Sequence, residues 1–199
     1  MLIYAIRHGQ TDWNAEDRFQ GARDIPLNDI GRGQARVNGR LLAQELGSTI
    51  TEFDFVASPL GRTRETMELI RAEIGLPVAD YRTDDRIIEV CFGDWETRTL
   101  EELSLDQPDA VAKREADKWH FIPPGNDAES YEILSWRVAS WLSTVDRPTI
   151  CVCHGGVIRS LFKLVGQLPA EDAVVMPVHQ DRIVLIKDGS ASWLPVAGD

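Results

Sequence analysis

Short apolar segments alternate with helical patterns along this chain of 199 residues, and this alternation constrains its fold more than any other feature. Three of the apolar segments, Leu2–Ile6, Phe53–Ala57 and Thr149–Cys153, have the length of buried strands. Between them, apolar residues recur at helical spacing. Strands that alternate with helices in this way typically lie parallel in one sheet. The sequence therefore predicts a three-layer α/β/α fold, with a mostly parallel sheet and helices on both faces.

Turn and capping signals place the remaining elements. Helices are expected over Asn28–Leu46, Glu129–Leu142 and Val157–Val165. A fourth helix is expected to begin after Ser58 as N-cap, with Pro59 at the first helical position, and to end at about Gly75. Two further strands are expected at Thr83–Val90 and Arg182–Lys187. Arg64 and Arg71, on the helix that follows Ser58, are expected to face solvent.

Residues 94–126 differ from the rest of the chain because they are highly charged and interrupted by prolines. Pro108 and Pro123-Pro124 break the pattern, which leaves one short helix at Leu100–Leu105. We interpret this stretch as an insertion over the sheet and not as a second domain. The expectation is a single domain over residues 1–199 with a lid-like insertion at about residues 94–126.

The charge balance limits the classes of partner that the protein is expected to bind. The chain has 21 Lys and Arg against 32 Asp and Glu, a formal net charge of −11, which disfavours non-specific binding to nucleic acid or to an anionic membrane. No apolar run approaches the ~18 residues of a membrane span. The opening segment ends at Arg7 and lacks a basic region before it, which favours a strand over a signal peptide. We expect a cytoplasmic protein without nucleic-acid or membrane partners, and leave a homodimer open.

Three strand ends carry residues that could support chemistry: Arg7-His8-Gly9, Ser58-Pro59 with Arg62 in the turn that follows, and His154-Gly155-Gly156. Because parallel strands place their carboxyl ends at one edge of a sheet, these groups are expected to meet there. A cation next to His8 disfavours the imidazolium and keeps a ring nitrogen free as a nucleophile. Two imidazoles and two guanidiniums, without a carboxylate cage for Mg²⁺, predict a phosphate pocket.

The segment Arg7 to Asn14 resembles the R-H-G-x-T-x-x-N signature of the histidine phosphatase superfamily, in its phosphoglycerate-mutase-like branch. Five further blocks resemble the family in the same order: Gln20-Gly21 with Asp24, Pro26-Leu27, Gly31 and Gln34-Ala35; Ser58-Pro59-Leu60 with Arg62-Thr63 and Thr66; Glu89 with Gly93 and Trp95-Glu96; Pro124-Gly125 with Glu129-Ser130 and Arg137; and His154-Gly155-Gly156 with Arg159. Six blocks in order leave little room for chance.

The resemblance implies a role for each matching residue. His8 would be the nucleophile that becomes a phosphohistidine, and Glu89 would protonate the leaving oxygen and later deprotonate the attacking water. Arg7, Arg62 and His154 would hold the phosphoryl oxygens. The binding pocket would be completed by Asn14, Gln20, Gly21 and the Gly155 backbone. The implied activity is a phosphomonoesterase that hydrolyses a small phosphorylated metabolite and needs no metal or other cofactor, because arginines can neutralise a phosphoryl group in place of a metal.

Two departures from the family pattern lie in the region that would face the substrate. Thr97 stands where family members commonly have Gly, so the turn there is expected to differ. Asn126-Asp127-Ala128 lengthens the spacing between Gly125 and Glu129. Both leave the identity of the substrate open more than they affect the chemistry.

The same residues admit other interpretations. Cys153 and Arg159 fit the C-x5-R pattern of cysteine-dependent phosphatases, with Cys153 as nucleophile. That interpretation leaves the Arg7-His8 block unexplained, and no Trp-Pro-Asp acid loop is visible. Cys151, Cys153 and His154 are too few ligands for a closed zinc site, which disfavours a metal. A non-catalytic phosphate-binding protein would usually lack a pocket residue, and none is missing here.

Within the family, phosphoglycerate mutase activity is the main alternative to phosphatase activity. A mutase must hold a second anionic group, yet residues 90–128 contain four Lys or Arg against nine Asp or Glu. The pair Lys113-Arg114 is the local basic feature that could hold a distal charge. The phosphatase is therefore favoured and the mutase kept as the alternative.

Overall fold

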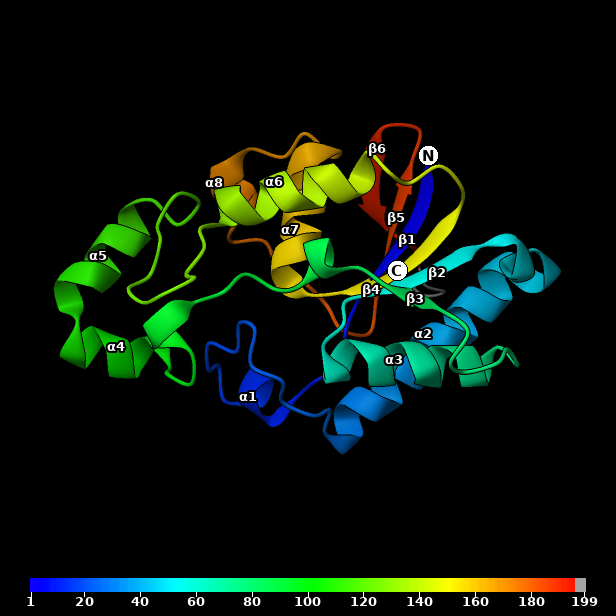
Figure 1. The fold of residues 1–199 in the computed structure, drawn as a ribbon, viewed down its shortest axis with the longest axis horizontal. Coiled ribbons are helices and arrows are strands. Elements are labelled where there is room, and N and C mark those ends of the chain that lie inside the picture. The colour runs from blue at the N-terminus through cyan, green and yellow to red at the C-terminus, as the bar shows by residue number, and fades with distance from the viewer. Residues whose placement is uncertain (196–199) are drawn as a thin grey trace.

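The computed structural model describes residues 1–195, whose strands form one six-stranded sheet in the order β3-β2-β4-β1-β5-β6 (Figure 1). Strands β3, β2, β4 and β1 run parallel, whereas β5 and β6 are antiparallel to their neighbours. The strands are β1 Leu2–Arg7, β2 Asp54–Ala57, β3 Arg82–Thr83, β4 Thr149–Cys153, β5 Ile183–Lys187 and β6 Ser190–Trp193. The predicted mostly parallel sheet is confirmed.

Helices cover both faces of the sheet because neighbouring strand residues point to opposite faces. Ile6 packs in the core under α2 (Asp29–Leu46) and α3 (Gly61–Glu73). Ala5, the residue before it, packs in the core under α6 (Tyr131–Leu142) and α7 (Gly155–Leu164). Figure 1 shows the two helix pairs on opposite sides of the strands. This arrangement confirms the predicted three layers.

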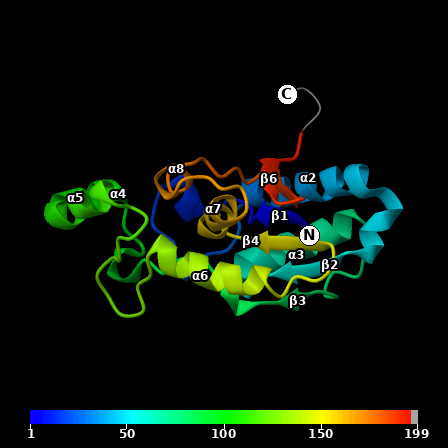
Figure 2. The same cartoon turned by 90° about the horizontal axis from the view of Figure 1, so that it is seen from above.

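The charged segment 94–126 folds into two short helices, α4 (Leu100–Asp106) and α5 (Pro108–Ala116). Figures 1 and 2 place both at one end of the molecule, and not over a face of the sheet as expected. Pro108 does not break the structure but begins α5, a position that requires no N–H donor. The helices enclose a small apolar cluster built on Trp95, Leu103 and Val111.

Some elements differ from those expected from the sequence. Ser58 does not cap α3, which begins at Gly61 after Leu60. The expected strand Thr83–Val90 reduces to the two residues of β3, because the Asp84 side chain accepts from the Arg86 amide and starts a 3₁₀ turn. The short helices α1 (Asp12–Ala15) and α8 (Ala170–Ala173), and the strand β6, were not predicted.

Thr97 keeps the backbone conformation that favours glycine, with φ of 79°. Its amide donates to Phe19 O at 2.8 Å and its carbonyl accepts from Arg18 at 2.8 Å. These contacts join the segment after Trp95 to the loop after α1. The turn is therefore held in place although its residue carries a β-branched side chain, which is strained in this conformation.

Candidate active site

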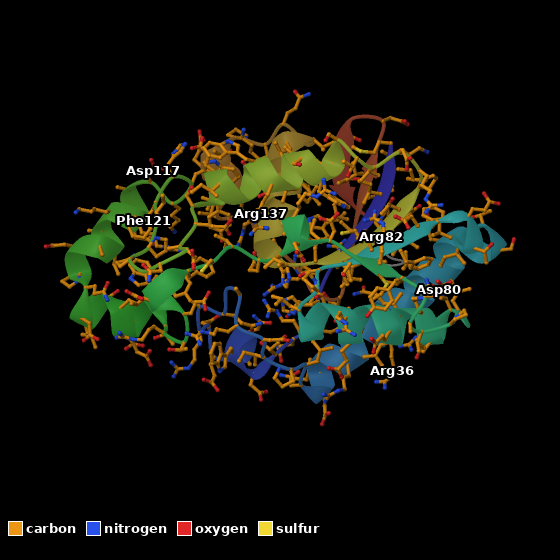
Figure 3. All side chains as sticks on the ribbon, viewed as in Figure 1. Arg36, Asp80, Arg82, Asp117, Phe121 and Arg137 are labelled. Carbon is orange, nitrogen blue, oxygen red and sulfur yellow. The ribbon has the colours of Figure 1, made fainter. Side chains whose placement is uncertain are left out.

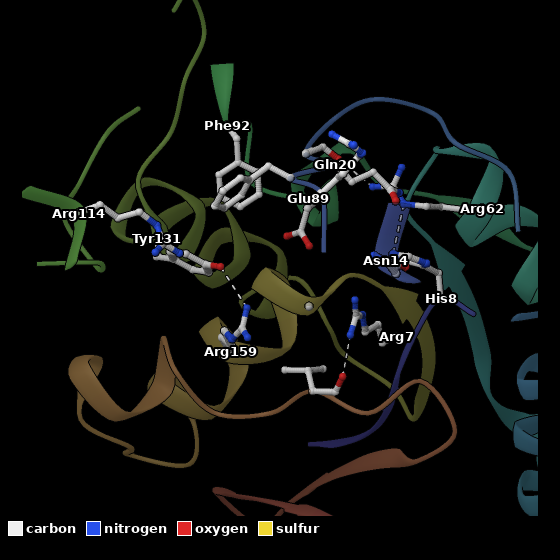
Figure 4. A pocket seen from close by; sticks show the side chains of 15 residues that line it. Arg7, His8, Asn14, Gln20, Arg62, Glu89, Phe92, Arg114, Tyr131 and Arg159 are labelled. Carbon is white, nitrogen blue, oxygen red and sulfur yellow. Dashed lines mark hydrogen bonds between the residues drawn. The ribbon is translucent and has the colours of Figure 1, made fainter. Parts of the chain in front are cut away.

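The carboxyl ends of β1, β2 and β4 border a pocket of about 200 Å³ (Figure 4). This volume lies below the ~300–1,000 Å³ of pockets for drug-sized ligands, so the pocket suits a small molecule. Its lining contains five arginines and one carboxylate, a strongly positive set in a chain of net charge −11. The lining residues with charged or ring side chains are Arg7, His8, Arg18, Phe19, Arg62, Glu89, Phe92, Arg114, Tyr131 and Arg159.

His8 lies directly after β1 and is buried. Its backbone amide donates to Cys153 O at 2.9 Å, which fixes the residue at the strand end. Ring atom Nδ1 lies 2.7 Å from Gly9 O, and a carbonyl can only accept, so Nδ1 carries the proton. Nε2 is therefore unprotonated and accepts from Arg62 Nε at 3.2 Å. Burial, followed by Arg62 and Arg7, holds the pKa of His8 well below 6.5. The ring is neutral at physiological pH.

His154 follows β4 in the same way and stands as the residue before α7. Its ring centroid is 5.2 Å from that of His8. Nδ1 lies 3.2 Å from Arg62 Nη2 and must accept, because guanidinium groups have no acceptor. Nε2 then donates to Ser58 Oγ at 2.8 Å. Burial and Arg62 hold the pKa of His154 well below 6.5, so this ring is also neutral.

Arg62 connects the two histidines. It lies in the first turn of α3, is 1% exposed, and also donates to Gly21 O at 2.8 Å and to Arg23 O. Burial lowers its pKa to about 10, which leaves the group charged at neutral pH. The two backbone acceptors come from the loop after α1. Arg62 thereby fixes that loop against the histidines.

Arg7 brings a second guanidinium to the pocket. Its Nη1 donates to Val178 O at 2.8 Å, while its Nε is buried without a partner. A buried donor without a partner costs about 1–3 kcal/mol, which an anion in the pocket would offset. Burial lowers the pKa of Arg7, partly balanced by the nearby Glu89. The geometry suits an anionic ligand between Arg7 and Arg62.

Glu89 faces the same space from the segment after the 3₁₀ turn at Asp85–Ile87. Its carboxylate accepts from the Gly156 amide at 3.0 Å and from its neighbour Val90 at 3.0 Å. Arg137 on α6 holds this segment by donating to Ile88 O at 2.6 Å and Glu89 O at 3.0 Å. Arg137 is in turn paired with Glu129 at 2.7 Å. Arg137 and Glu129, two of the residues of the fifth sequence block, therefore position Glu89.

Two of the expected binding residues orient Arg62, and a third, Asn14, lines the pocket itself. Gln20 is buried and, with its amide nitrogen on Thr11 Oγ1, its oxygen accepts from Arg62 Nη1 at 3.0 Å and shares the single Nε–H of Arg62 with His8 Nε2. Gly21 offers its carbonyl to Arg62, so both residues orient Arg62 instead of donating to a ligand. Asn14 lines the pocket, and its Oδ1 accepts from the Thr11 amide and from Gln180. Its amide nitrogen is therefore the atom that can serve a ligand.

The remaining expected residue, Gly155, is the first residue of α7 and lines the pocket, where helix N-termini favour anions. All the predicted site residues thus lie around one pocket or hold those that do. Cys153 does not line it. Burial raises the pKa of its thiol, which does not fit a nucleophilic thiolate. Within residues 1–195, no group of three or more His, Cys, Asp or Glu could hold a metal ion.

Several residues of the site were not predicted in these roles. Gln180 donates to His8 O at 3.1 Å and to Asn14 Oδ1 at 3.0 Å, from a loop 172 positions away from His8. Ser58, the expected N-cap of α3, instead accepts from His154. Buried Glu96 accepts from the Ala22 amide at 3.0 Å and so holds the loop that binds Arg62. The sequence signal for Ser58 and Glu96 was their place in the quoted blocks; Gln180 had none.

The neutral histidines predict how stability depends on pH. An unfolded chain exposes both imidazoles at a pKa of about 6.5. Below that pH the unfolded state takes up protons that folded His8 and His154 do not, so stability falls as the pH drops. The expected loss is up to roughly 1.4 kcal/mol per pH unit for each histidine. Urea unfolding between about pH 7.5 and pH 5 measures it.

A variant with both histidines replaced by Asn isolates this effect from the titration of carboxylates. We expect the variant to lose stability less steeply than the wild type as the pH falls below 6.5. Equal slopes for the two proteins would contradict the assignment of neutral, buried rings.

Comparison with known proteins places this geometry in context. The model of the histidine phosphatase superfamily (branch 1) matches residues 3–194. Glucosyl-3-phosphoglycerate phosphatase from Mycobacterium tuberculosis is 32% identical over 208 residues, covering 98% of this chain and 85% of that protein. Phosphoglycerate mutase-like protein 4 from Arabidopsis thaliana is 34% identical over 81% of this chain and 69% of its own length.

Solved structures agree with the sequence matches. The α-ribazole phosphatase from Shigella flexneri has a TM-score of 0.78 at 26% identity, over 96% of this chain and 94% of that one. The mycobacterial glucosyl-3-phosphoglycerate phosphatase in complex with VO3 has a TM-score of 0.75 at 27% identity, over 97% and 96% of the two chains. Within residues 1–195, no helix has the length and apolar content to cross a bilayer.

Proposed function

The chain belongs to branch 1 of the histidine phosphatase superfamily, and from this premise we propose that it is a metal-independent phosphomonoesterase that hydrolyses a small phosphorylated metabolite. The observation that carries the proposal is the state of His8. Its ring is neutral, its unprotonated Nε2 accepts from Arg62 Nε, and His8 lines the pocket together with Arg7 and Arg62. An unprotonated nitrogen next to fixed cations is what attack on a phosphoryl group requires.

In the first step, His8 Nε2 attacks phosphorus and the bond from phosphorus to the ester oxygen breaks. Glu89, in its acid form, gives its proton to the leaving oxygen. Arg7, Arg62 and the Gly155 amide stabilise the charge on the phosphoryl oxygens, and Asn14 donates from its amide nitrogen. A bound dianion would also favour a proton on His154 Nδ1, which would then donate to a phosphoryl oxygen.

In the second step, Glu89 takes a proton from a water molecule, which attacks the phosphohistidine. The nitrogen–phosphorus bond breaks and inorganic phosphate is released, so that His8 is again neutral and Glu89 again protonated. Dividing the reaction at a covalent intermediate replaces one difficult step by two easier ones.

We also propose that residues 1–199 form one domain in which residues 94–126 act as a lid. The presence of Arg114 of α5 among the pocket residues supports this role.

Phosphate release from p-nitrophenyl phosphate tests the proposal. We expect turnover that is unchanged after treatment with EDTA and dialysis. A quench during turnover of a ³²P-labelled ester should trap label on the protein that is stable to base and lost in acid, as phosphohistidine is. Loss of activity in EDTA that added metal restores, or the absence of any labelled protein during turnover, would contradict the mechanism.

Gly156 gives a prediction for the position of Glu89. A Cβ atom at residue 156 would lie 2.3 Å from Glu89 Oε1 and 2.8 Å from Leu134 Cδ2, so the carboxylate has to move. We expect Gly156→Ala to lower kcat by about 10²–10⁴-fold, the usual contribution of a general acid–base group. Gly33→Ala is the matched control, since nothing lies within 4 Å of that site. Wild-type kcat in a folded Gly156→Ala protein would contradict the role of Glu89 as general acid and base.

A specific observation supports mutase-type phosphoryl transfer as a second candidate. Arg159 lines the pocket beside Arg7. Its Nε and Nη2 groups both donate to Met176 O, and its Nη1 donates to Tyr131 Oη. A guanidinium has five N–H donors, so one is left on each Nη, and these two suit a second anionic group such as a carboxylate. Phosphoglycerates carry both groups.

Incubation with 3-phosphoglycerate and catalytic 2,3-bisphosphoglycerate separates the two candidates. The phosphatase proposal expects free phosphate to accumulate faster than 2-phosphoglycerate. The opposite order would establish the mutase. Among esters, the related names suggest glucosyl-3-phosphoglycerate and α-ribazole 5′-phosphate as compounds for a hydrolysis panel.

A further inference from the structure

A second cavity, of about 470 Å³, lies at the opposite edge of the sheet from the catalytic pocket. Asp54, the first residue of β2, and Arg147, just before β4, line it. His154 follows the far end of β4. The five residues of that strand span roughly 16 Å at about 3.3 Å per residue. The second cavity is therefore separate from the catalytic pocket, and the two share no lining residue among those described.

Arg71 is a buried cation in the lining of this cavity. It was expected to face solvent, but its side chain is 3% exposed. The guanidinium lies 4.3 Å from the centre of the Phe55 ring, and Nε donates to Pro77 O at 2.7 Å. The pair between its Nη2 and the carboxylate of Asp80 spans 3.7 Å, longer than a hydrogen bond. Burial lowers the pKa of Arg71, the sign of a charge that its surroundings compensate incompletely.

Two more guanidiniums line the same cavity. Arg82 pairs with Asp54 at 2.8 Å, and Arg147 lies 3.4 Å from the other oxygen of that carboxylate. Figure 3 labels Arg82 and Asp80 at this end of the molecule. Three cations thus face two carboxylates, and Asp80 is largely exposed, whereas the whole chain has a net charge of −11. The local excess of positive charge predicts attraction for an anion.

Part of the lining is apolar. Phe53, Phe55 and Leu76 form part of the wall, next to the ring of Tyr81. Inorganic phosphate alone would leave this apolar surface in contact with water. A ligand that covers the wall and also contacts the guanidiniums gains binding free energy from buried apolar surface and from charge-assisted hydrogen bonds.

We propose that this cavity is a second ligand site, which binds an organic anion with a flat apolar body and places its carboxylate or phosphate group against Arg71 and Arg147. The flat body lies along the wall of Phe53 and Leu76. Arg82 is occupied by Asp54 and shapes the rim. This site does not depend on the proposed phosphatase activity.

NMR titration of the ¹⁵N-labelled full chain tests the proposal, with the Arg71 Nε–H as reporter because that proton is held by Pro77 O. Benzoate and phenylphosphonate should shift it saturably with Kd values below about 10 mM. Inorganic phosphate should bind at least several-fold more weakly. The tighter of the two aromatic anions identifies the preferred charged group. The Gly155 amide reports binding at the catalytic pocket separately.

Variants locate the binding, with the backbone amides of Asp54 and Tyr81 as reporters in Arg71→Lys, which lacks the Nε–H. Arg147→Ala, at a 64% exposed side chain, should weaken binding about two- to fivefold, and Arg71→Lys about tenfold. Arg40→Ala removes an exposed charge on α2 and should change nothing. If Arg71→Lys does not fold, Arg147→Ala carries the test. Shifts confined to Gly155, equal binding of inorganic phosphate, or Kd values unchanged in Arg147→Ala would each overturn the proposal.

Discussion

A His8→Ala variant is expected to lose phosphatase activity by at least about 10⁴-fold while remaining folded. The reason is that Nε2 of His8 is the atom that would form the bond to phosphorus, and alanine offers no substitute. Both nitrogens of the His154 ring have other roles: Nε2 donates to Ser58 Oγ, and Nδ1 is the atom proposed to donate to a phosphoryl oxygen. Steady-state hydrolysis of p-nitrophenyl phosphate measures the loss, and the ³²P label on the protein should disappear with it.

Two controls make this result specific. His120→Ala removes an exposed imidazole that is bonded to Asp117 and lies outside the pocket lining, so activity should stay within about twofold. Cys153→Ser tests the cysteine-dependent interpretation, which requires complete loss, whereas a buried thiol outside the pocket predicts little change in rate. Activity that survives in His8→Ala and vanishes in Cys153→Ser would replace the histidine mechanism by the cysteine one.

The strands that could be predicted are those with a strong local signal. Leu2–Ile6 and Thr149–Cys153 are apolar because both faces of a central parallel strand are buried, and the structure confirms them. β6 escaped prediction because an edge strand of alternating exposure needs few apolar residues. Thr83–Val90 has a strand-like composition, but Arg86 turns the chain instead, because its backbone amide donates to the Asp84 carboxylate and its guanidinium pairs with it. A short-range side-chain bond of this kind competes with strand pairing.

In the site, too, some features could be predicted from local sequence and others could not. The meeting of His8, Arg62 and His154 could be predicted, because all three lie at strand ends that a parallel sheet brings to one edge. The contacts that orient them could not, because they join loops that are remote in sequence. Gln180 is the clearest example, as it holds both His8 and Asn14 from the connection before β5. No local pattern distinguishes such a glutamine from one on the surface.

Arg62→Ala is the second change with a large expected effect. Arg62 is the one side chain among those described that contacts both histidines and also holds the Gly21 and Arg23 carbonyls. Its removal takes a positive charge from the transferring phosphoryl group and frees the loop that it fixes. We expect kcat/KM for p-nitrophenyl phosphate to fall by about 10³-fold or more, as for arginines that stabilise phosphoryl transfer. The unfolding free energy should also fall, by about 1–3 kcal/mol, because buried acceptors lose their donor.

Arg64→Ala is the matched control, since Arg64 lies on the same helix two residues further and is exposed. It should keep activity within about twofold. Arg62→Lys separates charge from geometry: an ammonium keeps the charge but lacks the planar fork that reaches the Gly21 and Arg23 carbonyls together, so a loss of about 10²-fold should persist. A folded Arg62→Ala protein with wild-type kcat/KM would contradict the convergence of His8, His154 and Arg62 on one phosphoryl group, and with it the proposed mechanism.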